Sequence, residues 1–313
     1  MSTAFPHSPL AALRGQPVHV VEVGPRDGLQ NEHAHVPTDE KIHFVDQLAA
    51  SGVSCIEVSA FVSPHRVPQM ADAAAVFAGL TRRPGVRYTA LVPNLAGLRR
   101  ALSAGVDEVA IFAAASETFS RKNINQGIDE SLVAYAEVCH AARDAGVSVR
   151  GYLSTCFGCP FEGAVPAGRV AALASRLMDL GVREVALSDT IGVAHPGQVW
   201  EVLAATALVV PTTALALHFH DTRGTALANV LAGLEAGVRT FDAAAGGLGG
   251  CPYAPGASGN LATEDLVYLL DGLGMVSGIS LAGVLAASVS LQPRIGHPMP
   301  SRVLQAAVRS SGE

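Results

Sequence analysis

The feature that most constrains the fold is a repeated alternation of short apolar runs with longer alanine-rich stretches. The apolar runs are rich in Val, Ile and Leu, and they recur at intervals of roughly 20 to 40 residues, as strands of a βα repeat do. We expect strands near Val18–Val23, Ser54–Ser59, Val86–Leu91, Glu108–Phe112, Val147–Leu153, Glu184–Ser188, Ala214–His218 and Thr240–Ala243. Such continuous apolar strands are typical of a parallel sheet covered by helices.

Amphipathic stretches between these strands predict the covering helices. We expect them near Asp39–Ser51, Gln69–Leu80, Leu95–Ala104, Glu130–Ala145, Ala167–Leu180, Gly197–Leu208, Thr225–Glu235 and Thr263–Leu270. Several of them end at a glycine, the residue that most easily adopts a left-handed helix cap. These glycines are Gly52, Gly105, Gly146, Gly181 and Gly237.

Eight βα units in 313 residues favour closure into a (β/α)₈ barrel, an α/β fold of the TIM-barrel type. A doubly wound open sheet is the alternative, although the chain has no strand-linked G-x-G-x-x-G motif. We expect one catalytic domain over residues 1–313, with the barrel at about 18–275 and a helical extension at about 276–313. A helix near Ser280–Leu291 would pack outside the barrel or over its mouth.

Composition excludes several classes of partner. The net charge of −6 and the aromatic content of 5% provide neither a basic stripe nor stacking platforms for nucleic acid. No apolar run is long enough to span a membrane, and Pro6 and Pro9 interrupt the first residues where a signal sequence would lie. Five cysteines without framework spacing argue against a disulfide scaffold. We expect a soluble cytoplasmic protein, and the predominance of arginine over lysine suggests a bacterial source.

Polar residues gather where the predicted strands end. In a (β/α)₈ barrel the carboxyl ends of the strands meet at one end, which carries the chemistry. The candidates there are Arg26, Asp27, Gln30, Glu57, Arg150, Asp189, Thr190, His218 and His220. Among them, we expect Arg26, Gln30, Arg150 and Thr190 to bind substrate.

His218 and His220 alternate along a strand end, so both imidazoles would point to the same side. They could be structural histidines, but two of them beside carboxylates favour a metal site. With Asp27 and Asn260 the donors are nitrogen and oxygen without thiolate. This set suits Mg²⁺ or Mn²⁺, although Zn²⁺ or Co²⁺ could also occupy it.

Arg26 and Asp27 lie between Gly-Pro and Asp-Gly turns that lift both side chains off the strand. They could form a simple surface ion pair. A fixed cation next to a metal-bound substrate would instead stabilise a developing negative charge. Glu57, inside an apolar strand, needs a partner for its carboxylate, and Arg26 is available.

A glycine-rich loop, Gly246–Asn260, holds Cys251. Burial of a cysteine as a small apolar residue is difficult in such a loop, so a functional thiol and an active-site lid are favoured. Cys156 and Cys159 form a single C-x-x-C, for which packing is the better interpretation than a zinc ribbon.

These motifs closely resemble the hydroxymethylglutaryl-CoA lyase family. The resemblance extends from about Val18 to Gly283, and the glycine loop with its cysteine is its most specific part. Its other motifs are Val23–Glu32, Phe61–Pro64, Lys122–Asn125, Ser188–Gly192 and Leu261–Asp265. Isopropylmalate synthase and related barrel enzymes share the Arg-Asp-Gly and His-x-His features.

The resemblance implies a divalent-metal lyase that splits 3-hydroxy-3-methylglutaryl-CoA into acetyl-CoA and acetoacetate, as in leucine degradation. CoA would enter only as part of the substrate, and the enzyme would be a homodimer. The metal ligands would be Asp27, His218, His220 and Asn260. Arg26 would stabilise the enolate oxygen, Cys251 would handle a proton, and Glu57 and Asp189 would support the site.

Three alternatives stay open at this point. The preferred substrate could be a longer branched 3-hydroxyglutaryl-CoA, such as an isohexenyl analogue. The chain could be a 2-keto acid aldolase or a condensing enzyme on the same barrel. It could also be an inactive metal- or acyl-CoA-binding protein, which the retained Arg26, Asp27, Cys251 and both histidines argue against.

Overall fold

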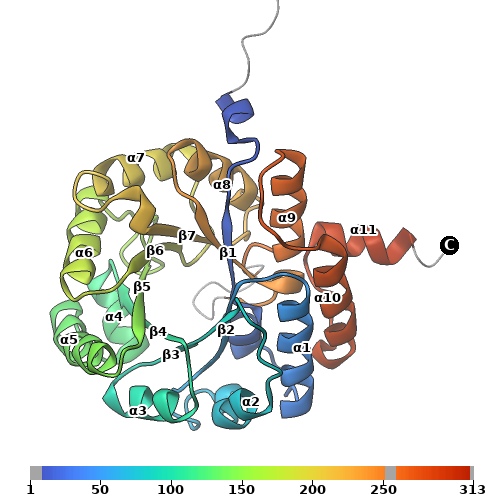
Figure 1. Ribbon diagram of the computed structural model, residues 1–313. Helices are drawn as coiled ribbons and strands as arrows, with labels where there is room; N and C mark the ends of the chain where they lie inside the picture. Colours follow the sequence, from blue (N-terminus) through green and yellow to red (C-terminus); the bar gives the residue numbers. More distant parts are fainter. Residues whose placement is uncertain (1–8, 251–258, 311–313) are drawn as a thin grey trace, which may run out of the picture.

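A computed structural model describes residues 9–250 and 259–310 of the chain. Eight parallel strands form a closed barrel, in which every strand pairs with its sequence neighbours and the first pairs with the last (Figure 1). They are β1 (His19–Glu22), β2 (Cys55–Ala60), β3 (Arg87–Leu91), β4 (Glu108–Ala114), β5 (Ser148–Ser154), β6 (Glu184–Asp189), β7 (Leu215–Phe219) and β8 (Thr240–Ala243). The predicted (β/α)₈ barrel is confirmed, and the open-sheet alternative is wrong.

Helices surround this barrel in a ring (Figure 1). They are α1 (Thr38–Ala50), α2 (Ala73–Gly79), α3 (Leu95–Ser103), α4 (Glu117–Ile124), α5 (Ile128–Asp144), α6 (Ala167–Asp179), α7 (Pro196–Thr206), α8 (Ala226–Glu235), α9 (Thr263–Gly272), α10 (Leu281–Ile295) and α11 (Arg302–Ser310). Two short helical turns, η2 (Gly24–Gly28) and η5 (Ala245–Gly247), follow β1 and β8.

The predicted helix at Gln69–Leu80 is too long. The chain forms a 3₁₀ turn at Pro68–Met70 and begins α2 only at Ala73. The five predicted helix-stop glycines all have positive φ, between 72° and 96°. A residue with a Cβ is disfavoured in that region, which explains why glycine ends these helices.

The C-terminal extension contains two helices rather than the single helix expected near Ser280–Leu291. Helix α10 packs against α1 and α9, so it completes the outer ring instead of covering the mouth of the barrel. Helix α11 lies beside α9 and α10 on the outside (Figure 1). No helix in the described part of the chain has the length and apolar character needed to cross a bilayer.

Alternation along the strands divides the side chains between two environments. On β5, Val149 and Leu153 belong to the apolar layer shared with the helices, whereas Arg150 and Tyr152 contact polar residues of β8 and β2 across the barrel. The barrel interior is therefore unusually polar. Its buried ionisable groups must be paired, because an unpaired buried charge is costly.

Candidate active site

A pocket of about 620 Å³ opens at the C-terminal end of the barrel. Six of the predicted site residues line it, and Gly250 lines it as the last described residue before Cys251. The six are Arg26, Asp27, Gln30, Thr190, His218 and His220. Residues from the ends of β1, β6, β7 and β8 thus meet as the strand-end argument predicts.

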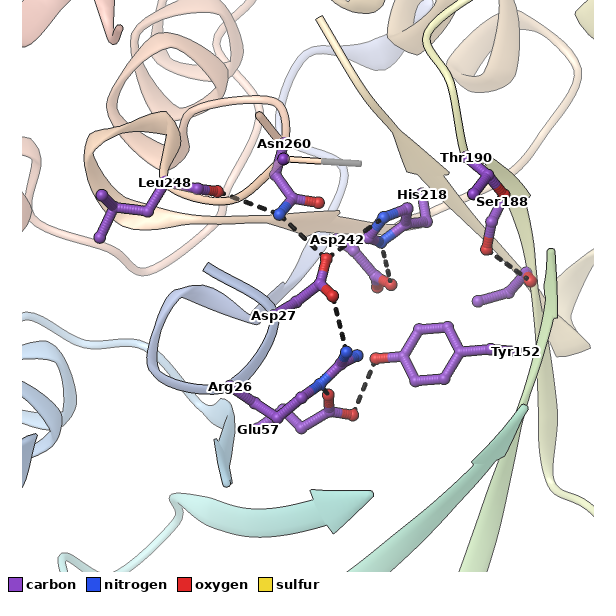
Figure 2. Close-up of polar contacts among 12 residues, drawn as sticks. Arg26, Asp27, Glu57, Tyr152, Ser188, Thr190, His218, Asp242, Leu248 and Asn260 are labelled. Carbon is purple, nitrogen blue, oxygen red and sulfur yellow. Dashed lines mark hydrogen bonds and ion pairs between the residues drawn. The ribbon is translucent and has the colours of Figure 1, made fainter. Parts of the chain in front are cut away.

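Asp27, His218 and His220 form a cluster that could hold a metal ion. One ligand atom from each of the three lies within 4.8 Å of the others. Asn260 reaches the cluster from the far end of the glycine loop, and its Nδ2 donates to Asp27 Oδ2 at 3.0 Å and to the Leu248 carbonyl at 3.0 Å (Figure 2). His220 pairs with Asn260 in an isolated β-bridge.

The donor set fits a divalent cation. Asn260 Oδ1 and His220 Nδ1 are buried and have no hydrogen-bond partner among the residues that the structure describes. A buried polar atom without a partner is destabilising, so such atoms in a functional pocket indicate a missing ligand. A carbonyl oxygen, a carboxylate and two imidazoles are all suitable ligands for a divalent ion.

The turn η2 places Asp27 and its neighbour Arg26 in this cluster. The backbone N–H groups of Arg26, Asp27 and Gly28 all donate to the Val23 carbonyl, which folds the chain sharply at the end of β1. At Gly28 a Cβ would lie 2.9 Å from the Cβ of Leu248, so the turn can press against the glycine loop only with glycine there.

Electrostatics keep the cluster ready to bind a cation. Burial alone would raise the pKa of Asp27, but Arg26, His218 and His220 outweigh it and lower that pKa to about 2. Burial, reinforced by His218, lowers the pKa of His220 to about 4. At neutral pH Asp27 is thus a carboxylate and His220 is a neutral imidazole, the forms that bind metals.

Arg26 is held from two sides. Its Nε donates to Glu57 Oε1, and its Nη1 donates to Asp27 Oδ1 at 2.6 Å (Figure 2). Tyr152 Oη donates to the other oxygen of Glu57 at 2.9 Å, and the guanidinium carbon lies 5.6 Å from the Tyr152 ring centroid. The predicted pairing of Glu57 with Arg26 is confirmed. Because both Glu57 oxygens accept hydrogen bonds, this carboxylate orients the arginine.

Two glutamates that the sequence analysis missed fix the start of the glycine loop. Glu22 accepts from the backbone N–H of Ala245 at 2.9 Å, and Glu264 accepts from that of Gly246 at 2.9 Å. Both carboxylates are fully buried. Burial, partly offset by hydrogen bonds, raises each pKa to about 7.

Asp242 and Tyr152 also support the site, although they were not among the residues predicted from the sequence. Asp242 Oδ2 lies 3.1 Å from His218 Nδ1, and the rings of Tyr152 and His218 meet in a T-shape at 83° (Figure 2). An aspartate inside the buried strand Thr240–Ala243 was the available signal, because such a carboxylate needs a partner. Its partner lies on another strand and is not visible in the sequence.

Four predicted residues in the described part of the chain do not line the pocket. Glu57 and Asn260 contact Arg26 and Asp27, which do line it, whereas Arg150 and Asp189 serve other contacts. Arg150 is the third residue of β5, deep in the barrel, where Asp242 and Glu184 occupy its donors, so the expectation that it binds substrate is wrong. Asp189 is fully buried and accepts the backbone N–H groups of Val193 and Ala194 at 3.0 and 2.9 Å. It thus orders the loop after β6, next to Thr190, which does line the pocket.

The four cysteines in the described part of the chain are free and buried. Cys156 and Cys159 are packed in the interior, where the Cys159 thiol contacts Ser116 Oγ at 2.9 Å. The packing interpretation of this C-x-x-C is therefore supported. Cys251, the predicted functional thiol, lies outside the described residues.

Comparisons with known proteins show what the whole chain is similar to. The chain matches the HMGL-like family over residues 17–290. It is 51% identical over 294 residues to the mitochondrial hydroxymethylglutaryl-CoA lyase of Gallus gallus, covering 94% of this chain and 99% of that protein. It is 49% identical over 288 residues to a hydroxymethylglutaryl-CoA lyase of Bacillus subtilis, covering 92% and 96%. The crystal structure of hydroxymethylglutaryl-CoA lyase from Pseudomonas aeruginosa superposes with a TM-score of 0.93 at 49% identity, covering 95% and 99%.

Proposed function

Because the chain belongs to the HMGL-like family, we propose that it is an enzyme that cleaves 3-hydroxy-3-methylglutaryl-CoA to acetyl-CoA and acetoacetate. The observation that carries the proposal is the cluster of Asp27, His218 and His220 next to the buried Arg26. Negative charge develops on the C3 oxygen and on the enolate oxygen during this reaction. A cation site beside a fixed guanidinium could stabilise both charges.

The reaction breaks one carbon–carbon bond and moves two protons. The C3 hydroxyl loses its proton, the C2–C3 bond breaks as the C3 carbonyl forms, and its electron pair leaves on C2 as the enolate of acetyl-CoA. C2 then takes up a proton. The site must lower the pKa of the hydroxyl, stabilise the enolate oxygen and deliver the second proton.

Asp27, His218, His220 and Asn260 would hold the metal, most favourably Mg²⁺ or Mn²⁺. When bound, the ion supplies Lewis-acid polarisation of the substrate oxygens and lowers the pKa of the C3 hydroxyl. The unpartnered Asn260 Oδ1 and His220 Nδ1 support this assignment.

Arg26 would stabilise the enolate oxygen. Glu57 and Asp27 engage Nε and Nη1, so the guanidinium has one fixed orientation. Within the described residues no hydrogen bond engages Nη2, which would leave it for a substrate oxygen. A donor that is already oriented does not have to reorganise as charge develops, which lowers the barrier.

Cys251 would deliver the proton to C2, and Gln30 and Thr190 would contact the substrate. Gly250 lines the pocket, and its carbonyl accepts a hydrogen bond from Asn31 Nδ2 at 2.9 Å, which places the residue before Cys251 at the site. Closure of the loop over bound acyl-CoA would shield the enolate from water.

We further propose that the chain acts as a single catalytic domain and as a homodimer in the cytoplasm. Its reaction would serve leucine degradation. These assignments follow from the family rather than from a contact in the structure.

A direct assay tests the proposal. Metal-loaded protein is supplied in parallel with 3-hydroxy-3-methylglutaryl-CoA, with its isohexenyl analogue or with a 4-hydroxy-2-keto acid, and the acetyl-CoA and keto-acid products are measured. We expect acetoacetate from the first thioester with the higher kcat/KM. Preference for the longer branch, cleavage of 2-keto acids alone, or no product from metal-bound protein would each contradict the assignment.

A further inference from the structure

A line of buried charged residues crosses the barrel below the pocket and ends at His218. Glu184 Oε1 accepts from Arg150 Nε at 2.7 Å. Arg150 donates through both Nη atoms to the two carboxylate oxygens of Asp242, at 2.7 and 3.1 Å. Asp242 Oδ2 is also 3.1 Å from His218 Nδ1 (Figure 2).

We propose that Asp242 and Arg150 are positioning residues that lock His218 into the tautomer with the proton on Nδ1, so that the lone pair of Nε2 faces the metal position. The inference rests on the proposed metal site and adds two residues that act on it through His218. Neither residue lines the pocket.

The tautomer follows from the chemistry of the acceptor. An ionised carboxylate has no hydrogen to donate, so a hydrogen bond between Asp242 and His218 requires the proton on Nδ1. The opposite nitrogen, Nε2, then carries the lone pair, and it lies 3.8 Å from Asp27 Oδ2 within the cluster. A carboxylate behind a metal-binding imidazole in this way fixes ring orientation and makes the ligand more basic.

Arg150 prevents the carboxylate from turning away. Its bidentate contact fixes the plane of the Asp242 carboxylate, and Glu184 fixes the guanidinium in turn. The centroid of the Tyr152 ring lies 4.9 Å from the Arg150 guanidinium carbon, and this ring forms a T-shaped contact with His218, which restricts rotation of the imidazole.

The second histidine of the pair shows a contrast. His220 Nδ1 is buried, and no atom in the described ranges 9–250 and 259–310 forms a hydrogen bond with it. Nδ1 is therefore the nitrogen of His220 that is left for the ion, whereas His218 uses its Nδ1 for Asp242 and leaves Nε2 for the ion.

The first test observes the tautomer directly. The metal-free, full-length protein is labelled with ¹⁵N-histidine, and the imidazole signals are recorded near pH 8, with His218 assigned by the signal that disappears in His218→Gln. We expect Nδ1 to be protonated and Nε2 to be bare. Protonation of Nε2 instead would overturn the inference. This test leaves Asp242 and Arg150 unchanged, so it does not depend on the folding of a variant at either position.

The second test measures the dissociation constant for Mn²⁺ of Asp242→Asn, which keeps the size of the side chain. Loss of a partner behind a metal ligand typically weakens metal binding by about 10- to 100-fold, which is the effect we expect. Glu108→Gln is the matched control, because Glu108 is equally buried in the barrel and bound to Arg183 but has no contact with His218. It should bind Mn²⁺ as the wild type does.

Arg150→Lys keeps the positive charge but replaces the fork with a single ammonium, and we expect an intermediate loss of Mn²⁺ affinity. Thermal unfolding confirms that each variant is folded. If folded Asp242→Asn binds Mn²⁺ with wild-type affinity, the positioning role of Asp242 is refuted while the proposed metal site stands. If the wild type binds no Mn²⁺, the proposed metal site fails with it.

Discussion

Arg26→Met should depress turnover severely while leaving the metal in place. The substitution removes the guanidinium that we propose faces the enolate oxygen, and it keeps a side chain of similar length. Arg26 is 7% exposed, so water cannot replace the lost charge.

The size of the effect can be worked from the surroundings of the guanidinium. A cation about 3 Å from a full negative charge, at an effective dielectric of about 20, gives roughly 5 kcal/mol of attraction. Asp27 and Glu57 already neutralise part of the Arg26 charge, which reduces its field at the substrate. Loss of a single oxyanion donor costs about 2.7 to 4 kcal/mol in kcat. We therefore expect a loss near 4 kcal/mol, or roughly a thousandfold fall in kcat.

The assay measures acetoacetate formation at saturating thioester and Mn²⁺ affinity on the same preparation. Arg26→Lys should recover little of the lost turnover, because one ammonium nitrogen cannot occupy the separate positions from which the guanidinium nitrogens reach Glu57, Asp27 and a substrate oxygen. Arg183→Met removes another half-buried arginine, at the start of β6 and thus at the opposite end of the barrel, and should leave kcat within about threefold. A kcat for Arg26→Met within about tenfold of wild type, with metal bound, would refute the reasoning.

Three further predictions concern the support of the site. Tyr152→Phe removes the hydrogen bond to the buried Glu57 carboxylate and should cost about 2 kcal/mol in the free energy of unfolding, measured in urea; an unchanged midpoint would contradict it. Cys251→Ser should bind Mn²⁺ normally but turn over orders of magnitude more slowly, and a substrate analogue should protect the wild-type thiol from alkylation; wild-type activity or unprotected alkylation would show that another residue moves the proton. Burial raises the pKa of Glu22 and of Glu264 from 4.5 to about 7, so the folded state binds their protons more tightly than the unfolded state does. This difference adds to the free energy of unfolding; the contribution is complete below pH 4.5 and is lost as the pH rises through 7. Urea unfolding between pH 5 and 8 should show a flatter pH dependence for Glu22→Gln, and an unchanged slope would argue against a raised pKa.

The barrel could be predicted because its signals are local. Each strand is a short apolar run, and the strand Thr240–Ala243 was placed without error. Helix α4 was missed because its stability comes from its ends rather than from an apolar stripe. Ser116 caps its start by accepting the Phe119 N–H, and Asn125 ends it in the left-handed conformation. Between them lie Arg, Lys and Asn, which look like loop.

The metal cluster could be predicted for a different reason. The carboxyl ends of parallel strands always meet, so Asp27 and His218 had to converge although they are far apart in the chain. The depth of a residue along its strand was harder to judge. Arg150 was placed at the active end, but it lies in the third position of β5, opposite Glu184 of β6. Its pairing with Asp242 joins residues separated by 92 positions and exists only in the closed barrel.

The most direct test of the central claim is a titration of metal-free protein with Mn²⁺, in which bound metal and acetoacetate formation are measured together. The account predicts no turnover after chelation, recovery in proportion to a single bound ion, and loss of both binding and turnover in Asp27→Ala and in His218→Ala, since each removes one of about four protein ligands. Full cleavage of 3-hydroxy-3-methylglutaryl-CoA by the chelated protein, or by a His218→Ala protein that binds no Mn²⁺, would contradict it.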